Sequence, residues 1–235
     1  MASPNDNFQL RDGTDALFEV RSKDTSTAQD GSLHSMRHLA TPYPVDYGTG
    51  GCFQMVSVSG TIGAGLSANS PIYSFRWTSS TLLALVRRVK LTAWSLGTGF
   101  TAGIGAFEMY RATSWTVADS GGATETLTSP AGKLRTTVAG SLVAEIRRSS
   151  TGTLTAGTRT KDTLYMGRVT AGVSTATNTP FVPDTHAPLF EKIGAEHPLT
   201  LAQNQGFVIQ ATVPATGTWS FSIKTEWDEV PLVNY

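Results

Sequence analysis

The clearest pattern of hydrophobic and polar positions lies near the end of the chain, between Thr218 and Trp227. Apolar or β-branched residues alternate there with polar ones, in the order Trp219, Ser220, Phe221, Ser222, Ile223, Lys224, Thr225, Glu226 and Trp227. Strict alternation places successive side chains on opposite faces of a β-strand, so that one face is buried and the other meets water. The pattern therefore predicts a strand of antiparallel sheet.

A second strand pattern precedes this one, from Gly206 to Val213, and the residues Pro214 to Gly217 separate the two. Two strand patterns joined by a short segment with proline and glycine are typical of a β-hairpin. We therefore expect the end of the chain to form such a hairpin.

Further strand patterns recur along the chain and are separated by loops rich in glycine, serine and proline. They occupy Phe53–Ser59, Ile72–Trp77, Leu82–Trp94, Phe100–Tyr110, Leu164–Val173 and Leu199–Ala202. Long helical patterns do not alternate with them, which disfavours a parallel α/β fold. About eight strands separated by loops predict an all-β fold, an antiparallel β-sandwich of jelly-roll-like topology.

The run from Leu82 to Trp94 is long for a strand and has no clean apolar face. Arg87, Arg88 and Lys90 interrupt its aliphatic residues. A β-bulge or a bend near Arg87 would explain the broken alternation, because a bulge inserts one extra residue into a strand. A short basic helix is the alternative interpretation of this run.

Residues 1–50 have no sustained hydrophobic period, apart from a short strand pattern at Ala16–Val20. We therefore expect them to form an extended N-terminal arm, and residues 51–235 to form the sandwich domain. Between residues 113 and 163 the sequence is mostly polar and contains one apolar segment, Leu142–Ile146. This part predicts a loop-rich insertion around a strand pair or a short helix.

The composition narrows the range of partners. Only 15% of the residues are charged, and the formal net charge is zero. A neutral chain has no long-range attraction for nucleic-acid phosphates or anionic lipids, so we expect neither nucleic acid nor membrane as a partner. A surface with few charges has little protection against association, which favours burial in an assembly. The sequence opens without a signal-peptide pattern and has no apolar run that could span a bilayer, so we expect a protein made in a reducing cytoplasm.

Residues that could bind a metal are few. The candidates that lie closest together in the sequence are Asp184, His186, Glu191, Glu196 and His197. Metal sites built on histidine usually need two imidazoles on a rigid frame, whereas these two lie in a proline-rich segment without HxH or HxxxH spacing. We expect a polar loop there and no metal site.

Three carboxylates, Glu226, Asp228 and Glu229, close the last strand pattern. Two carboxylates can act as acid and base in a glycosidase, but the sequence identifies no partner from another strand. We expect a solvated strand end with salt bridges to Arg76 or Arg87. P-loop and nucleophile-elbow motifs are absent from the sequence as well. These observations predict a protein that is not an enzyme and uses no cofactor.

Five tryptophans raise the question of a sugar-binding platform. Trp77, Trp219 and Trp227 lie on strand patterns and are therefore expected in the core. The pattern leaves the positions of Trp94 and Trp115 open.

Four stretches carry a resemblance to known proteins: Val56–Ile62, Ser70–Thr78, Ala106–Thr116, and the end of the chain from Glu196 through Trp227-Asp-Glu. Through these stretches the chain resembles a family of virion structural proteins of tailed bacteriophages. These are scaffold sequences rather than catalytic motifs, and the first fifty residues match least well. The resemblance implies a location in the virion, no enzymatic activity and no cofactor.

Together these observations favour a capsid decoration or cement protein that binds the major capsid protein and copies of itself, as a homotrimer. An irregular arm can wrap a neighbour and add contact area with little fold of its own. The candidate interface residues are Phe8, Leu10, Leu17 and Phe18 in the arm and Phe181, Val182, Leu189 and Phe190 in the proline-rich loop. Ordinary packing beneath the loops is the alternative for these residues.

A host-recognition module, such as a fibre or spike head that binds surface glycan, is the competing function. Its candidate residues are the loop aromatics Tyr43, Tyr47 and Trp115. The sequence lacks a coiled-coil or repeat stalk that would project a fibre head, which favours decoration.

Overall fold

A computed structural model describes residues 8–11, 17–20, 51–63, 65–66, 69–127, 132–134, 141, 143–185, 188–193 and 196–232. The chain divides into two compact units, Met1–Asp46 and Tyr47–Tyr235, with the boundary close to the expected end of the arm. In the first unit, β1 (Phe8–Arg11) and β2 (Leu17–Val20) pair in antiparallel fashion. The strand pattern at Ala16–Val20 corresponds to β2.

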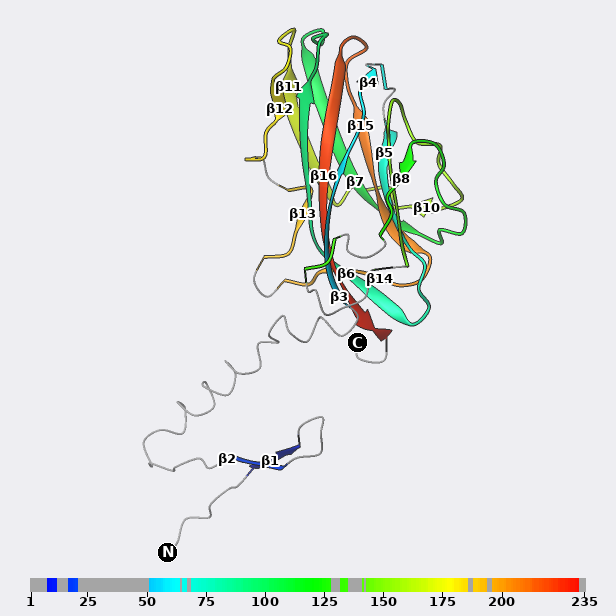
Figure 1. Ribbon diagram of the computed structural model, residues 1–235, viewed down its shortest axis with the longest axis vertical. Coiled ribbons are helices and arrows are strands. Elements are labelled where there is room, and N and C mark those ends of the chain that lie inside the picture. Colours follow the sequence, from blue (N-terminus) through cyan, green and yellow to red (C-terminus); the bar gives the residue numbers. More distant parts are fainter. Residues whose placement is uncertain are drawn as a thin grey trace, which may run out of the picture. The chain divides into compact units, whose positions relative to one another are not determined.

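The second unit consists of two antiparallel sheets that pack face to face (Figure 1). The sheet that we name the β16 sheet contains β3 (Gly51–Val58), β4 (Ile62–Gly63), β6 (Leu82–Ser95), β12 (Pro180–Val182), β13 (Phe190–Glu191), β14 (Leu199–Leu201) and β16 (Thr218–Pro231). The β15 sheet contains β5 (Ser70–Trp77), β7 (Gly103–Thr113), β8 (Ala123–Thr124), β9 (Ala144–Arg148), β10 (Thr160–Lys161), β11 (Gly167–Val173) and β15 (Gln205–Thr212). The expected β-sandwich is confirmed.

The order of the strands is that of a jelly roll. In the β16 sheet, β12, β13 and β14 together form one edge, followed by β6, β16 and β3. In the β15 sheet the order is β11, β7, β15, β5 and β9. The chain passes between the two sheets as in a jelly roll, which consists of two Greek keys. Its main strands follow in the order β3, β5, β6, β7, β11, the β12–β14 edge, β15 and β16.

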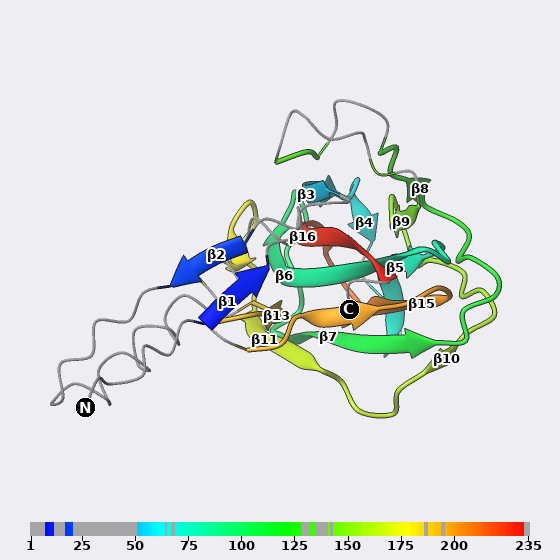
Figure 2. The ribbon, with the colours of Figure 1, turned by 90° about the horizontal axis from the view of Figure 1, so that it is seen from below.

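The predicted hairpin at the end of the chain is wrong, because β15 and β16 belong to different sheets. β15 pairs with β5 and β7, whereas β16 pairs with β3 and β6. Figure 2 shows the two layers from below, with β15 and β7 on one side and β16 and β3 on the other. A central position gives each strand two hydrogen-bonded neighbours, and the crossover at Pro214–Gly217 turns the apolar faces of both strands toward one core.

The predicted bulge at Arg87 is confirmed, and the helical alternative is wrong. Glu226 of β16 pairs with Arg88, but the next residue, Trp227, pairs with Val86, so Arg87 is the extra residue of β6. Ala84 and Val86 face the core before this point, and the core residues after it are Val89, Leu91 and Ala93. The bulge shifts the alternation by one residue and places both arginines outside the core.

Large aromatic side chains fill the space between the sheets. Trp77, Trp219 and Trp227 are fully buried, as expected from their strand patterns. Trp227 stacks on Phe53 with 5.3 Å between ring centroids and meets Phe75 edge-on at 5.4 Å. Such pairs add stabilisation beyond the apolar area that they bury. The functional surfaces therefore lie on the outer faces and at the ends of this packed sandwich.

Candidate functional site

The loop-rich insertion between β7 and β11 folds over the outer face of the β15 sheet. Trp115, which follows β7, is fully buried there against Tyr110, Ala112 and Val208. Its indole Nε1 donates a hydrogen bond to the carbonyl oxygen of Val117 at 3.0 Å. This second apolar cluster exists because the insertion brings a large aromatic residue to a sheet face that would otherwise meet water.

A buried ion pair holds the two arms of the insertion together. Arg159 pairs with Asp119, and their side chains are 6% and 0% exposed. The backbone N–H of Gly157 donates to Asp119 Oδ1 at 2.8 Å, and the Arg159 guanidinium lies 4.8 Å from the centre of the Trp115 ring. Burial lowers the pKa of Arg159 from its usual value. A buried charge without a partner of opposite sign is strongly destabilising, so this ion pair holds residue 119 beside residue 159.

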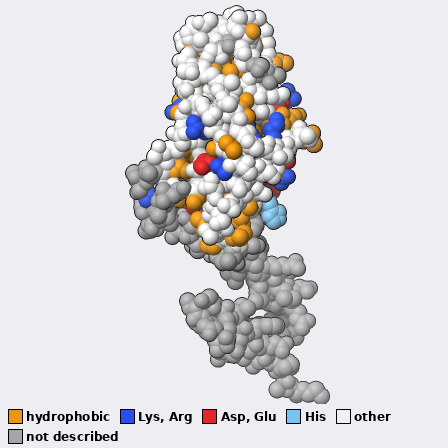
Figure 3. Space-filling view, turned by 90° about the vertical axis from the view of Figure 1, so that its right-hand side faces the viewer, with side chains coloured by type: hydrophobic (Ala, Val, Ile, Leu, Met, Phe, Trp, Pro, Cys, Tyr) orange, Lys and Arg blue, Asp and Glu red, His pale blue; other side chains and the backbone are white. Residues whose placement is uncertain are grey.

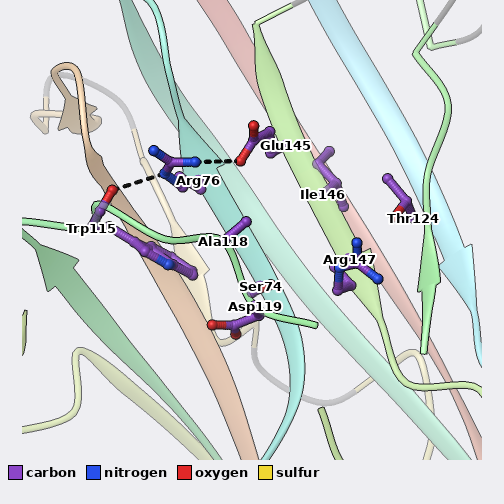
Figure 4. A pocket seen from close by; sticks show the side chains of 9 residues that line it. All are labelled: Ser74, Arg76, Trp115, Ala118, Asp119, Thr124, Glu145, Ile146 and Arg147. Carbon is purple, nitrogen blue, oxygen red and sulfur yellow. Dashed lines mark hydrogen bonds and ion pairs between the residues drawn. The ribbon is translucent and has the colours of Figure 1, made fainter. Parts of the chain in front are cut away.

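A pocket of about 180 Å³ lies between this insertion and the outer face of β5 and β9 (Figure 4). Its lining residues are Ser74, Arg76, Trp115, Ala118, Asp119, Thr124, Glu145, Ile146 and Arg147. Among the charged groups, Arg76 Nη1 lies 2.7 Å from Glu145 Oε2, and its Nε donates to the carbonyl oxygen of Trp115 at 2.9 Å. Arg147 Nη1 donates to the carbonyl oxygen of Gly121 at 2.8 Å.

The polar groups of this pocket attach the insertion to the β15 sheet. Each of its carboxylates, Asp119 and Glu145, is paired with an arginine, so their oxygens already take part in ion pairs. The arrangement suits hydrogen bonding to water or a small polar molecule and the attachment of the insertion to the sheet.

A second cluster of polar side chains covers the neighbouring part of the outer face of the β15 sheet. Lys161 Nζ lies 3.6 Å from the centre of the Tyr110 ring and donates to Gln210 Oε1 at 2.8 Å. The hydroxyl of Tyr110 donates to Glu108 Oε2, and burial together with this carboxylate raises the pKa of Tyr110 to about 12. Burial lowers the pKa of Lys161. These contacts stabilise the fold of β10 onto β7.

The expectation of a solvated carboxylate end on β16 is wrong for Asp228 and Glu229, which are 1% and 3% exposed. Burial raises the pKa of both carboxyls. The predicted salt bridge to Arg87 is present, with Arg87 Nε 3.0 Å from Asp228 Oδ2, whereas Arg76 pairs with Glu145 instead. Asp228 is buried because Leu85 lies opposite it on β6 and packs with Leu83 and Val230 on the outside of the sheet. Glu229 lies on the other face of β16, opposite Ala84 and beside Trp227.

The structure corrects the candidate interface residues of the proline-rich loop. Val182 and Leu189 are buried in the core, and Phe181 and Phe190 are partly buried and pack against it. These four residues form ordinary packing beneath the loops, because β12 and β13 pair with β6 and turn their apolar side chains inward.

The candidate residues of the arm occupy paired strand positions. Phe8 lies opposite Val20, Leu10 opposite Phe18, and Leu17 opposite Arg11. The side chains of these residues lie outside the described part of the structure.

The glycan-binding alternative loses one of its aromatic residues, since Trp115 is fully buried. Tyr43 and Tyr47 lie outside the described residues, as does His186. Within the described ranges, no three His, Cys, Asp or Glu side chains come together in a way that could hold a metal ion. No helix in those ranges is long and apolar enough to cross a membrane.

Sequence analysis missed the Asp119–Arg159 pair and the pocket. The two residues are separated by the whole loop-rich insertion, and a contact between distant positions leaves no spacing signal in a single sequence. Comparison with known proteins found no match of this chain to a protein-family model, a curated protein or a solved structure.

Proposed function

We propose that this chain is a structural subunit of a tailed-phage virion, a capsid decoration or cement protein that binds the major capsid protein and copies of itself. The resemblance to virion proteins supports the location. The neutral charge supports protein rather than nucleic acid as the partner. Both carboxylates of the pocket are held in ion pairs, Glu145 with Arg76 and Asp119 with Arg159, and this supports a binding role over a catalytic one.

One observation supports this proposal most strongly: the sheet of the first unit has only two described strands, each of four residues. An isolated two-stranded sheet is marginally stable in water and needs a further strand or an apolar surface to pack against. Phe8, Leu10, Phe18 and Val20 occupy directly paired, alternate positions. Alternate positions of a regular strand fall on one face, so the sequence and register predict an apolar face here, and we propose that this face docks on a capsid subunit.

Substitution on the two faces of this sheet tests the proposal. We expect Leu10→Lys to reduce the copies of the protein per particle about tenfold or more, because a charge on the docking face must be desolvated. Gln9→Lys is the matched control, since residue 9 lies on the other face, opposite Glu19. Copies per particle are measured by quantitative mass spectrometry of purified virions, and particle stability by thermal release of DNA.

Two results would contradict the proposal. One is equal occupancy of the particle by the Leu10→Lys variant, the Gln9→Lys control and the unaltered chain. The other is an absence of the protein from purified virions together with saturable binding to glycans, which would favour the receptor-binding alternative.

A further inference from the structure

One end of the sandwich, which we name the tip, is made without any charged residue. The tip consists of the described residues within 59–69, which include β4, and of the loops at 96–102, 174–179 and 213–217, and it lies at the top of Figure 1. Its sequence is mainly glycine, alanine, serine, threonine and asparagine, and it contains no Asp, Glu, Lys, Arg or His. The four loops connect different strand pairs, so their shared composition reflects their common place in the fold.

The absence of charge extends from the tip into the flanking strands. Four uncharged stretches of sequence pass through this end, namely residues 47–75, 91–107, 169–183 and 198–223. The first and the last also reach the opposite end through β3 and β14, but the tip is where all four come together, although 15% of the chain is charged. In Figure 3, the uppermost part of the molecule shows no blue or red side chains, and these gather lower down.

Hydrogen bonds between the loops make the tip a preformed surface. Phe100 N–H donates to the carbonyl oxygen of Ser174 at 3.0 Å, and Thr218 N–H donates to that of Thr98 at 2.8 Å. The hydroxyls of Thr101 and Thr216 lie 2.6 Å apart. At Gly99 an added Cβ would lie 2.1 Å from the carbonyl oxygen of Thr175, so the loops approach too closely for any larger residue. A surface fixed in this way loses little entropy on binding.

The described residues of the tip are available for contact. Thr98, Thr101, Ala102 and Thr216 are exposed, as are all residues from Ser174 to Thr179. Ile104, at the start of β7 beside the tip, is 69% exposed. The surface thus offers small neutral side chains, with hydroxyls that already bond to one another, next to an exposed aliphatic residue.

The lack of charge at the tip favours one kind of binding partner, a second copy of this chain. Nucleic acid, anionic lipid or a charged protein would be recognised by complementary charge, which the tip lacks. Close to a rotation axis, by contrast, identical residues of neighbouring copies approach one another, so a charge placed near the axis would meet a like charge. A neutral tip avoids this repulsion and also avoids the desolvation of buried ions.

We propose that the tip is the surface through which copies of this chain contact one another around a rotation axis. This inference rests on the proposed function and deepens it, because it names the contact between copies and separates it from the contact with the capsid. The first unit would dock on the capsid, and the tips would join neighbouring copies.

The test places like charges on the tip of the full chain. The double variant Ala102→Asp/Thr177→Asp changes two exposed positions of different loops. Its control, Ser80→Asp/Thr163→Asp, adds the same charge at exposed positions beyond the opposite ends of β6 and β11. Association is measured by sedimentation velocity over a range of protein and salt concentrations, and by cross-linking on purified particles.

We expect the tip variant to weaken association between copies about tenfold or more, because like charges are juxtaposed. High salt should restore part of the loss, since salt screens exposed charges, whereas a misfolded variant would not recover. The control should associate like the unaltered chain. Unchanged association of the tip variant in solution and on particles would overturn the inference, as would an unaltered chain that is monomeric in both settings.

The outcomes separate the two proposals. A tip variant that still occupies particles but no longer cross-links to its neighbours supports the inference and leaves the proposed function intact. Tip-dependent association of a chain that never binds particles overturns the proposed function alone. Binding of the tip to a glycan, abolished by the same variant, would overturn the inference in favour of receptor recognition.

Discussion

Tyr73 and Thr225 join the two sheets through the middle of the core, with 2.9 Å between the phenol oxygen and the threonine hydroxyl. Tyr73 belongs to β5 and Thr225 to β16, and both are fully buried. Burial raises the pKa of Tyr73 above its usual value, so the phenol keeps its proton. The side chain of Ser57 is a further polar neighbour of the Tyr73 hydroxyl. Polar contacts in largely apolar surroundings favour one alignment of the two sheets over alternatives.

Removal of either partner of this bond is expected to destabilise the fold. Tyr73→Phe deprives the buried Thr225 hydroxyl of its phenol partner, and Thr225→Val does the reverse, so each should lower the free energy of unfolding by about 1–3 kcal/mol. The double variant should lose less than the sum, because the hydroxyl that each single variant leaves without its partner across the core is then removed as well. Urea unfolding of the four proteins measures the coupling, and strictly additive losses would show that the bond contributes nothing.

A glycine in β15 is required by close packing. An added Cβ at Gly206 would lie 2.0 Å from the carbonyl oxygen of Phe75 and 2.9 Å from Trp115 Cζ3. Gly206→Ala should therefore lower the free energy of unfolding by about 1–3 kcal/mol, the usual cost of overpacking.

The control for this substitution is Gly172→Ala, since a Cβ at Gly172 would have no neighbour within 4 Å. That variant should be neutral or up to about 1 kcal/mol more stable, because alanine restricts the unfolded chain. Thermal unfolding compares the two, and equal effects would disprove the packing argument.

The buried Asp119–Arg159 pair is expected to be the main contact that holds the two arms of the insertion together. Asp119→Ala leaves the Arg159 charge buried without its partner, which should cost about 3–5 kcal/mol. Asp162→Ala breaks the exposed ion pair of Asp162 with Arg111, in which the arginine side chain is 50% exposed and the aspartate side chain 37%. This loss should lower the free energy of unfolding by less than about 1 kcal/mol. Hydrogen exchange should localise the first effect to residues near 115–121 and 153–161. A similar loss in both variants would contradict this account.

The buried carboxyl of Glu229 is expected to make stability depend on pH. Its neighbours are the indole Nε1 of Trp227, 3.3 Å from Glu229 Oε1, and Ser141, and the nearest charges along the strand are Asp228 and its partner Arg87. Burial raises the pKa of Glu229 above its ordinary 4.5. A carboxyl whose pKa is raised by folding binds its proton more tightly in the folded state. Its contribution is thus complete below the unfolded pKa and is lost as the pH rises through the folded pKa.

Glu229→Gln removes this titration. As the pH rises above 4.5, the unaltered chain should therefore lose free energy of unfolding relative to the variant. Asp228 titrates in both proteins and cancels in the comparison. Urea unfolding from acid to neutral pH measures the difference, and a constant value across that range would refute the prediction.

The sequence patterns located most strands, and they failed where distant segments had to be combined. The broken alternation between Val86 and Val89 correctly indicated the bulge at Arg87, because a bulge is a local change of phase. The residues Pro214–Gly217 correctly indicated a reversal of the chain, but a turn does not determine whether the next strand joins the same sheet. The burial of Asp228 was missed because Leu85 is distant in sequence and adjacent only across β6 and β16.

By itself, the sequence determined the antiparallel β-class, the buried face of β16 and the core positions of Trp77, Trp219 and Trp227. These follow from alternation, which is a property of neighbouring residues in one strand. Only the tertiary structure decided which sheet each strand joins, which charges are buried and which loops meet at the tip. The reason is physical: these features depend on contacts between segments far apart in the chain, and the energy of such contacts is set by the packing of the whole sandwich.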